Sequence, residues 1–96
     1  MSDEQLEEII NEITKGQRFI KFQILQIKLG LECGLSMEQV QIYAKPKYNF
    51  LQMEQIRLGF EQGLSEEQVQ MYTDSKFACT QMEEIREGIR NGLTIE

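Results

Sequence analysis

The stretch that decides the fold is Ile56-Arg57-Leu58-Gly59-Phe60-Glu61-Gln62-Gly63-Leu64-Ser65. It also occurs 29 residues earlier, as Ile27-Lys28-Leu29-Gly30-Leu31-Glu32-Cys33-Gly34-Leu35-Ser36. A looser copy follows 29 residues later, as Ile85-Arg86-Glu87-Gly88-Ile89-Arg90-Asn91-Gly92-Leu93-Thr94. Aligning residues 20–48 with 49–77 gives 15 identities in 29 positions. A fixed period of this length is typical of stacked supersecondary units, which mostly form binding surfaces.

Each unit is predicted to contain one long helix and one short helix. In the middle copy, apolar residues at helical spacing predict an amphipathic helix over about 49–62. Gly63 follows at the point where a helix end favours glycine in the left-handed conformation. Ser65 then begins the short helix, because Gln68 three residues later completes the spacing of a capping box. The first copy has the same order around Gly34.

A glycine recurs inside each long helix, at Gly30, Gly59 and Gly88. Glycine in a helix interior costs about 1 kcal/mol relative to alanine, so its recurrence indicates a use. We predict that the missing side chain lets the short helix or the next unit approach the backbone closely.

The amino-terminal residues 2–15 do not align with the repeat and are predicted to form a separate helix. Ser2 and Gln5 have the spacing of a capping box, and Gly16 closes the helix. We expect this helix to cover one face of the first long helix. That face changes along the chain, from Leu25 and Leu29 to Glu54 and Leu58, and then to Glu83 and Glu87.

These patterns predict one all-α domain over residues 1–96, a short helical-repeat (helix-turn-helix) solenoid of about 2.5 units with roughly six helices. Its expected parts are an amino-terminal cap helix over 1–16, repeat 1 over 17–45, repeat 2 over 46–74, and a truncated repeat 3 over 75–96. The long helix of the third copy is expected over about 77–91.

Composition limits the classes of function. The net charge of −6, from 16 acidic and 10 basic residues, opposes non-specific binding to nucleic-acid phosphates. Histidine is absent and neither Cys33 nor Cys79 is repeated, so we expect two reduced, partly buried thiols and no metal site. No apolar run approaches a membrane span, and the start of the chain lacks a basic signal-peptide region, which predicts a cytoplasmic protein.

The sequence contains no signature of catalysis or of cofactor binding. Its carboxylates lie beside Lys and Arg on helix surfaces. The predicted pairs are Glu61 with Arg57, Lys28 with Glu32, and Glu83 with Arg86. The two-helix corners do resemble DNA-binding helix-turn-helix motifs, with Gly30, Gly34 and Val40 at fitting positions. Nothing basic accompanies them to hold phosphates, which argues against direct nucleic-acid binding. We therefore predict that the protein is not an enzyme and that its partner is a protein.

The candidate partner-binding residues are acidic or polar side chains on expected solvent faces, together with apolar side chains that vary between copies. They are Phe50, Glu54, Leu58, Glu61, Glu66, Glu67, Gln70, Met71, Glu83 and Glu87.

One region resembles a known kind of repeat. It is Tyr43-Ala44-Lys45-Pro46-Lys47-Tyr48, followed by Gln52-Met53-Glu54-Gln55-Ile56-Arg57-Leu58-Gly59-Phe60-Glu61-Gln62-Gly63-Leu64. It is similar to short two-helix repeats of uncharacterised Firmicutes phage and mobile-element proteins, over about residues 17–96. The second linker, at Asp74-Ser75-Lys76, lacks the proline of the first. The resemblance implies a phage or mobile-element origin, and hence the host cytoplasm, but carries over no functional residue.

Three functions remain open from the sequence. The first is a protein–protein interaction module, in its sharper form an acidic anti-CRISPR-like inhibitor that blocks a basic nuclease or another host defence enzyme, as a DNA mimic or a steric wedge. The second is a helix-turn-helix adaptor that binds DNA. The third is a self-assembling structural protein, homodimers included, or one that sequesters a small ligand.

Overall fold

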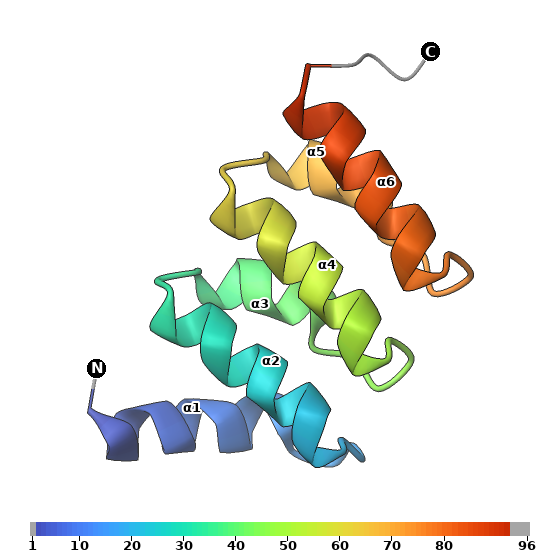
Figure 1. The fold of residues 1–96 in the computed structure, drawn as a ribbon. Helices are drawn as coiled ribbons and strands as arrows, with labels where there is room; N and C mark the ends of the chain where they lie inside the picture. The colour runs from blue at the N-terminus through green and yellow to red at the C-terminus, as the bar shows by residue number, and fades with distance from the viewer. Residues whose placement is uncertain (1, 93–96) are drawn as a thin grey trace.

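The computed structural model describes residues 2–92, and within that range the chain is helical and contains no strand (Figure 1). The prediction of an all-α chain with six helices is confirmed for these residues. The helices are α1 (Asp3–Thr14), α2 (Lys21–Glu32), α3 (Met37–Tyr43), α4 (Phe50–Glu61), α5 (Glu66–Gln70) and α6 (Cys79–Arg90).

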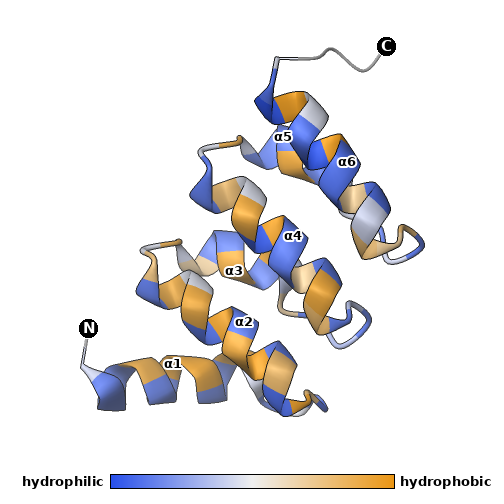
Figure 2. Cartoon of the chain, in the orientation of Figure 1, coloured by the Kyte–Doolittle hydropathy of each residue, from blue (hydrophilic) through white to orange (hydrophobic). Residues whose placement is uncertain are grey.

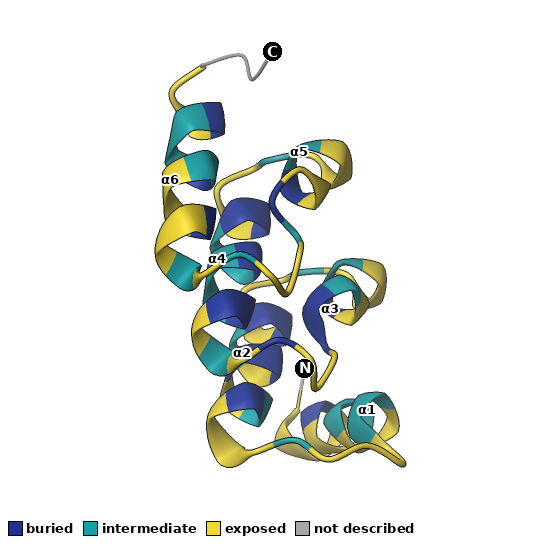
Figure 3. Cartoon of the chain, turned by 90° about the vertical axis from the view of Figure 1, so that its right-hand side faces the viewer, coloured by how far each residue is buried: buried dark blue, intermediate teal, exposed yellow. Residues whose placement is uncertain are grey.

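The helices form two layers (Figure 3). Helices α2, α4 and α6 lie side by side in what we call the long-helix layer, and α4 packs against both of its neighbours. Helices α1, α3 and α5 form the short-helix layer behind them. The chain alternates between the layers, so each corner carries it from one layer to the other.

All six helices have a glutamine at the third helical position, which caps the start of the helix. Its side-chain oxygen accepts a hydrogen bond from the backbone N–H of the residue before the helix, over 2.8 to 3.1 Å. The predicted capping boxes at Ser2, Ser36 and Ser65 are confirmed, and Asn49 completes a fourth. At α2 and α6 the residue before the helix is Ile20 or Ala78, which has no capping oxygen, and the glutamine acts alone.

The turns between long and short helices use glycine as predicted. Gly34 and Gly63 have φ values of 90° and 88°, a conformation that glycine adopts without a steric penalty. The next residue in each turn donates its N–H back to the mid-helix glycine carbonyl, from Leu35 to Gly30 and from Leu64 to Gly59, both over 3.0 Å. These bonds close the ends of α2 and α4.

The glycines inside the long helices make room for a tyrosine. Tyr43 and Tyr72 have no exposed surface, and their hydroxyls donate to the carbonyls of Gln26 (2.7 Å) and Gln55 (2.8 Å). A Cβ on Gly30 or Gly59 would lie 2.1 or 2.0 Å from that hydroxyl. The prediction of a close approach is therefore confirmed for two copies. For Gly88 the matching short helix would begin within residues 93–96, outside the described residues.

A second set of hydrogen bonds joins α2 and α4 to the linker that follows each of their units. The side-chain nitrogen of Gln23 donates to the carbonyls of Pro46 (3.3 Å) and Tyr48 (2.7 Å). One period later, Gln52 donates to the carbonyls of Ser75 (3.0 Å) and Phe77 (2.8 Å). Because both glutamines are buried and fully bonded, they fix the path of the chain between units.

The placement of α1 differs in part from the prediction. It packs against α2 and buries Leu6, but Leu25 remains 44% exposed, so α1 does not cover the expected face. The cause is its position in the short-helix layer, from which it meets the side of α2 that carries Ile24 and Lys28. Leu25 of the expected face therefore stays exposed, and Leu29 is half-buried.

Candidate protein-binding surface

The structure separates the predicted partner-binding residues into two groups. Phe50, Glu54, Leu58 and Glu61 follow one another at helical spacing along one stripe of α4. Glu83 and Glu87 stand at the matching positions of the neighbouring helix α6. The remaining four residues belong to the short-helix layer, where they are exposed at α5 and its end: Glu66, Glu67, Gln70 and Met71. The predicted set is therefore not one surface.

Two of the predicted acidic residues, Glu61 and Glu87, form ion pairs with arginines. Glu61 accepts from Arg57 over 2.6 Å, as the sequence predicted. Glu87 accepts from Arg86 over 2.8 Å and lies 3.6 Å from Arg90. Among the described residues, the predicted pairs of Arg86 with Glu83 and of Lys28 with Glu32 do not form. Arg86 turns toward Glu87 and the preceding helix. Glu83 is left exposed on the outer face of α6.

Exposed apolar side chains gather around the half-buried Phe50 at the start of α2 and α4, and of this group only Phe50 was predicted from the sequence. Phe22 is 56% exposed, and its ring lies against that of Phe50, with centroids 5.1 Å apart. Leu25 lies one turn further along α2, and Leu51 is exposed beside Phe50 on α4. Figure 2 shows the hydrophobic colour along α2 and at the start of α4. We call Phe22, Leu25, Phe50 and Leu51 the aromatic patch.

The sequence did contain a signal for this patch. Phe22 and Leu51 stand one period apart, so both were due to face the same way in the repeat. Neither falls on the buried stripe that contains Ile27 and Ile56. Apolar residues that recur at one repeat position outside the buried stripe indicate an exposed patch, because a side chain on that side of the helix does not reach the core.

The outer face of the long-helix layer changes in character from one end to the other. At equivalent positions it carries exposed Leu25 on α2, half-buried Glu54 on α4 and exposed Glu83 on α6. The aromatic patch thus borders acidic side chains on the same layer. Such a surface suits a partner that offers an apolar pocket next to positive charge.

Two arginines of this layer, Arg57 and Arg86, are structural. Arg86 is only 4% exposed and donates to Gln55 (3.0 Å), Gln62 (2.7 Å) and Glu87. Arg57 donates in the same way to Gln26, over 2.9 Å. Each guanidinium therefore joins one long helix to the one before it, and little of its positive charge is offered to a partner.

The two cysteines are free within the described structure, but their environments differ. Cys79 is half-buried, as expected, whereas Cys33 is exposed because it ends α2 at the corner. Partial desolvation and then the neighbouring Glu61 carboxylate raise the pKa of the Cys33 thiol. The raised pKa lowers the share of reactive thiolate at neutral pH.

Replacing Glu61 with glutamine is expected to increase the alkylation rate of Cys33. The change removes a negative charge and leaves the positive Arg57, so the thiol pKa falls and the rate at neutral pH rises by about threefold or more. Peptide-resolved mass spectrometry after timed exposure to iodoacetamide measures the rate. Glu66→Gln, on α5, is the matched control and should leave it unchanged. Equal rates in wild type and Glu61→Gln would contradict the assignment.

The helix-turn-helix corners present acidic and amide groups. The exposed side of α3 carries Glu38 and Gln41, and α5 is a helix of only five residues with Glu66 and Glu67 in its first turn. A recognition helix inserts into a groove lined with phosphates, where such carboxylates would be repelled.

None of the helices in the described part of the chain has the length and apolar character that crossing a bilayer requires. Comparison of the chain with known protein families, with curated proteins and with solved structures finds no match.

Proposed function

We propose that this chain is a non-enzymatic protein-binding module that contacts its partner through the aromatic patch. The observation that carries the proposal is the exposed Phe22 ring, which lies tilted against the Phe50 ring. Large aromatic side chains at the centre of a contact commonly supply most of the binding free energy. Here the pair is held on two packed helices, so little conformational entropy would be lost on binding.

The partner that fits this surface best is a basic, nucleic-acid-binding enzyme. Acidic side chains border the patch on the long-helix layer, and the whole chain carries a net charge of −6. A positively charged channel next to an apolar pocket would complement both features. In the narrower form of the proposal, the protein comes from a phage or mobile element and blocks a host defence nuclease.

The test is DNA cleavage by a panel of purified RNA-guided nucleases and restriction endonucleases, measured with increasing amounts of this protein. We expect dose-dependent inhibition of at least one enzyme. Phe22→Ser should weaken the inhibition by about 30-fold or more, because it removes an aromatic anchor. Met37→Ser removes an exposed apolar side chain from α3 and is the matched control. Inhibition that survives Phe22→Ser, or no inhibition of any enzyme, would contradict the proposal.

Ionic strength separates the two ways of blocking. If the acidic side chains replace phosphates, the affinity for the enzyme should fall steeply as the salt concentration rises, whereas binding by an apolar wedge should depend little on salt.

A mobility-shift assay with duplex DNA at low salt tests the DNA-binding alternative. A shift at micromolar protein would favour that alternative.

A further inference from the structure

Consecutive long helices are joined by one recurring contact. Arg57 on α4 donates to Gln26 on α2 over 2.9 Å, and Arg86 on α6 donates to Gln55 on α4 over 3.0 Å. The two pairs stand 29 residues apart. The middle long helix, α4, therefore offers a glutamine to the helix after it and an arginine to the helix before it.

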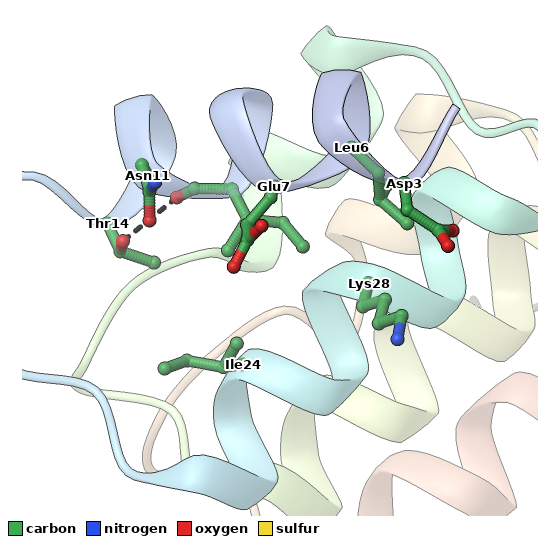
Figure 4. Close-up of a pocket in the computed structure, with 8 residues that line it drawn as sticks. Asp3, Leu6, Glu7, Asn11, Thr14, Ile24 and Lys28 are labelled. Atoms are coloured by element: carbon green, nitrogen blue, oxygen red, sulfur yellow. Dashed lines mark hydrogen bonds between the residues drawn. The ribbon is translucent and has the colours of Figure 1, made fainter. Parts of the chain in front are cut away.

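The first long helix, α2, has a cation at this position, but no other long helix precedes it within residues 2–92. Lys28 stands one period before Arg57, and it lines a cleft of about 470 Å³ between α1 and α2. Ile24 on the same wall is half-buried, whereas Met53 and Met82 at the matching positions are fully buried. Figure 4 shows the two helices facing each other across the cleft. The cleft thus lies where the repeat would place a preceding long helix.

The opposite face of the layer, on α6, has the complementary features. Glu84 stands one period after Gln55 and is exposed. Gln81 is exposed although its counterparts Gln23 and Gln52 are buried, and Ile85 is half-buried although Ile27 and Ile56 have no exposed surface. α6 therefore exposes side chains that the other long helices bury against their successors.

The order of the layers makes these two faces complementary. Within the described residues the first helix, α1, belongs to the short-helix layer and the last, α6, to the long-helix layer. A second copy placed beyond α6, in the direction in which α2, α4 and α6 follow one another, would continue both layers. Its α1 would lie beside α6 in the short-helix layer, and its α2 would be the next helix of the long-helix layer. In that register Glu84 of the first copy meets Lys28 of the second, as Gln55 meets Arg86 inside the chain.

A second pair of opposite charges fits the same register. Each short helix starts close to the end of the long helix before it, so the end of α6 would lie near the start of the next copy's α1. Arg90, whose side chain is 52% exposed, stands at that end of α6. Asp3 and Glu7 line the cleft near the start of α1. The carboxylates of the cleft would thus face a guanidinium.

We propose that copies of this chain associate head to tail, with α6 of one copy lying in the α1–α2 cleft of the next. A contact of one helix with one cleft is small, and the negative charge of each copy opposes association. The assembly is therefore weak, with a dissociation constant of about 0.1 to 1 mM. This surface is separate from the aromatic patch, so the assembly and the proposed function can fail independently.

Charge reversal tests the register. Sedimentation equilibrium of the full chain at about 0.1 to 1 mM should show concentration-dependent association. Lys28→Glu and Glu84→Lys should each weaken association by about tenfold, because each brings like charges together. A mixture of the two variants should associate again, since every contact then joins opposite charges. Within one chain, α4 lies between α2 and α6, so an effect on folding alone would not be rescued by mixing.

Matched controls reverse charges that lie outside the contact. Lys45→Glu, in the linker between α3 and α4, and Glu83→Lys on α6 keep the same net charge as the two test variants and should associate like wild type. Circular dichroism checks that all four variants remain helical. A chain that stays monomeric at the highest concentration would overturn the proposal and leave the cleft for a helix of another protein. Association that neither test variant weakens, or that mixing does not restore, would overturn it as well.

Discussion

Replacing Gly59 with alanine is expected to lower the free energy of unfolding by about 2 to 3 kcal/mol, although alanine is the better helix former. The new Cβ would overlap the Tyr72 hydroxyl, which lies 2.0 Å from its position. Tyr72 is fully buried and has little room to move, so its hydrogen bond to the Gln55 carbonyl would be strained or lost. Urea denaturation followed by far-ultraviolet circular dichroism measures the loss.

A double-mutant cycle identifies the cause. Tyr72→Phe removes the overlapping oxygen, so Gly59→Ala should cost at least about 1 kcal/mol less in that background than in wild type. Gly63→Ala is the control, because its cost arises from a positive φ of 88° and nothing lies within 4 Å of the new Cβ. Its cost should be the same with either residue at position 72. Additive effects of Gly59→Ala and Tyr72→Phe would contradict the proposed overlap.

The second large effect is expected at alkaline pH. Burial raises the pKa values of Tyr43 and Tyr72 well above 10, because each ionised hydroxyl would be a desolvated charge and could no longer donate its hydrogen bond. In the unfolded chain these tyrosines release protons at about pH 10. The unfolded state then binds fewer protons than the folded state, so stability falls as pH rises, by about 1.4 kcal/mol per pH unit for each tyrosine.

A tyrosine-to-phenylalanine variant should therefore change from less stable to more stable as pH rises. At pH 7, Tyr72→Phe loses one buried hydrogen bond and should cost about 1 kcal/mol. Above about pH 10 the variant escapes one of the two ionisation penalties, so its stability should overtake that of wild type near about pH 11. Guanidinium denaturation at a series of pH values measures both curves. Curves that stay parallel from neutral to alkaline pH would contradict the raised pKa of Tyr72.

Local rules predicted much of the fold. The capping boxes at Ser36 and Ser65 and the turn glycines Gly34 and Gly63 depend on residues three or four apart, and all were read correctly. The long helix expected over 49–62 is Phe50–Glu61, and the one expected over 77–91 is Cys79–Arg90. Their ends fall inside the predicted bounds because the residues before each first turn act as caps in an extended conformation.

The surface was harder to predict because exposure depends on which layer each helix joins. Helical periodicity showed that Leu25 shares a face with Leu29, but not whether α1 reaches that face. The same limit hid Phe22, whose exposure follows from the absence of any described helix in front of the long-helix layer. For the same reason, the predicted partner-binding set contains both Met71 and Phe50, although these residues belong to different layers.

The contact between Arg57 and Gln26 joins residues 31 apart, and Arg86 with Gln55 has the same separation. Among the described residues, no side-chain hydrogen bond reaches further along the chain. The protein can therefore acquire its structure while it is being synthesised, because each helix finds its partners in the segment the ribosome has just released. Each new helix docks on the helices already made, so only the newest unit has apolar area that still awaits a partner.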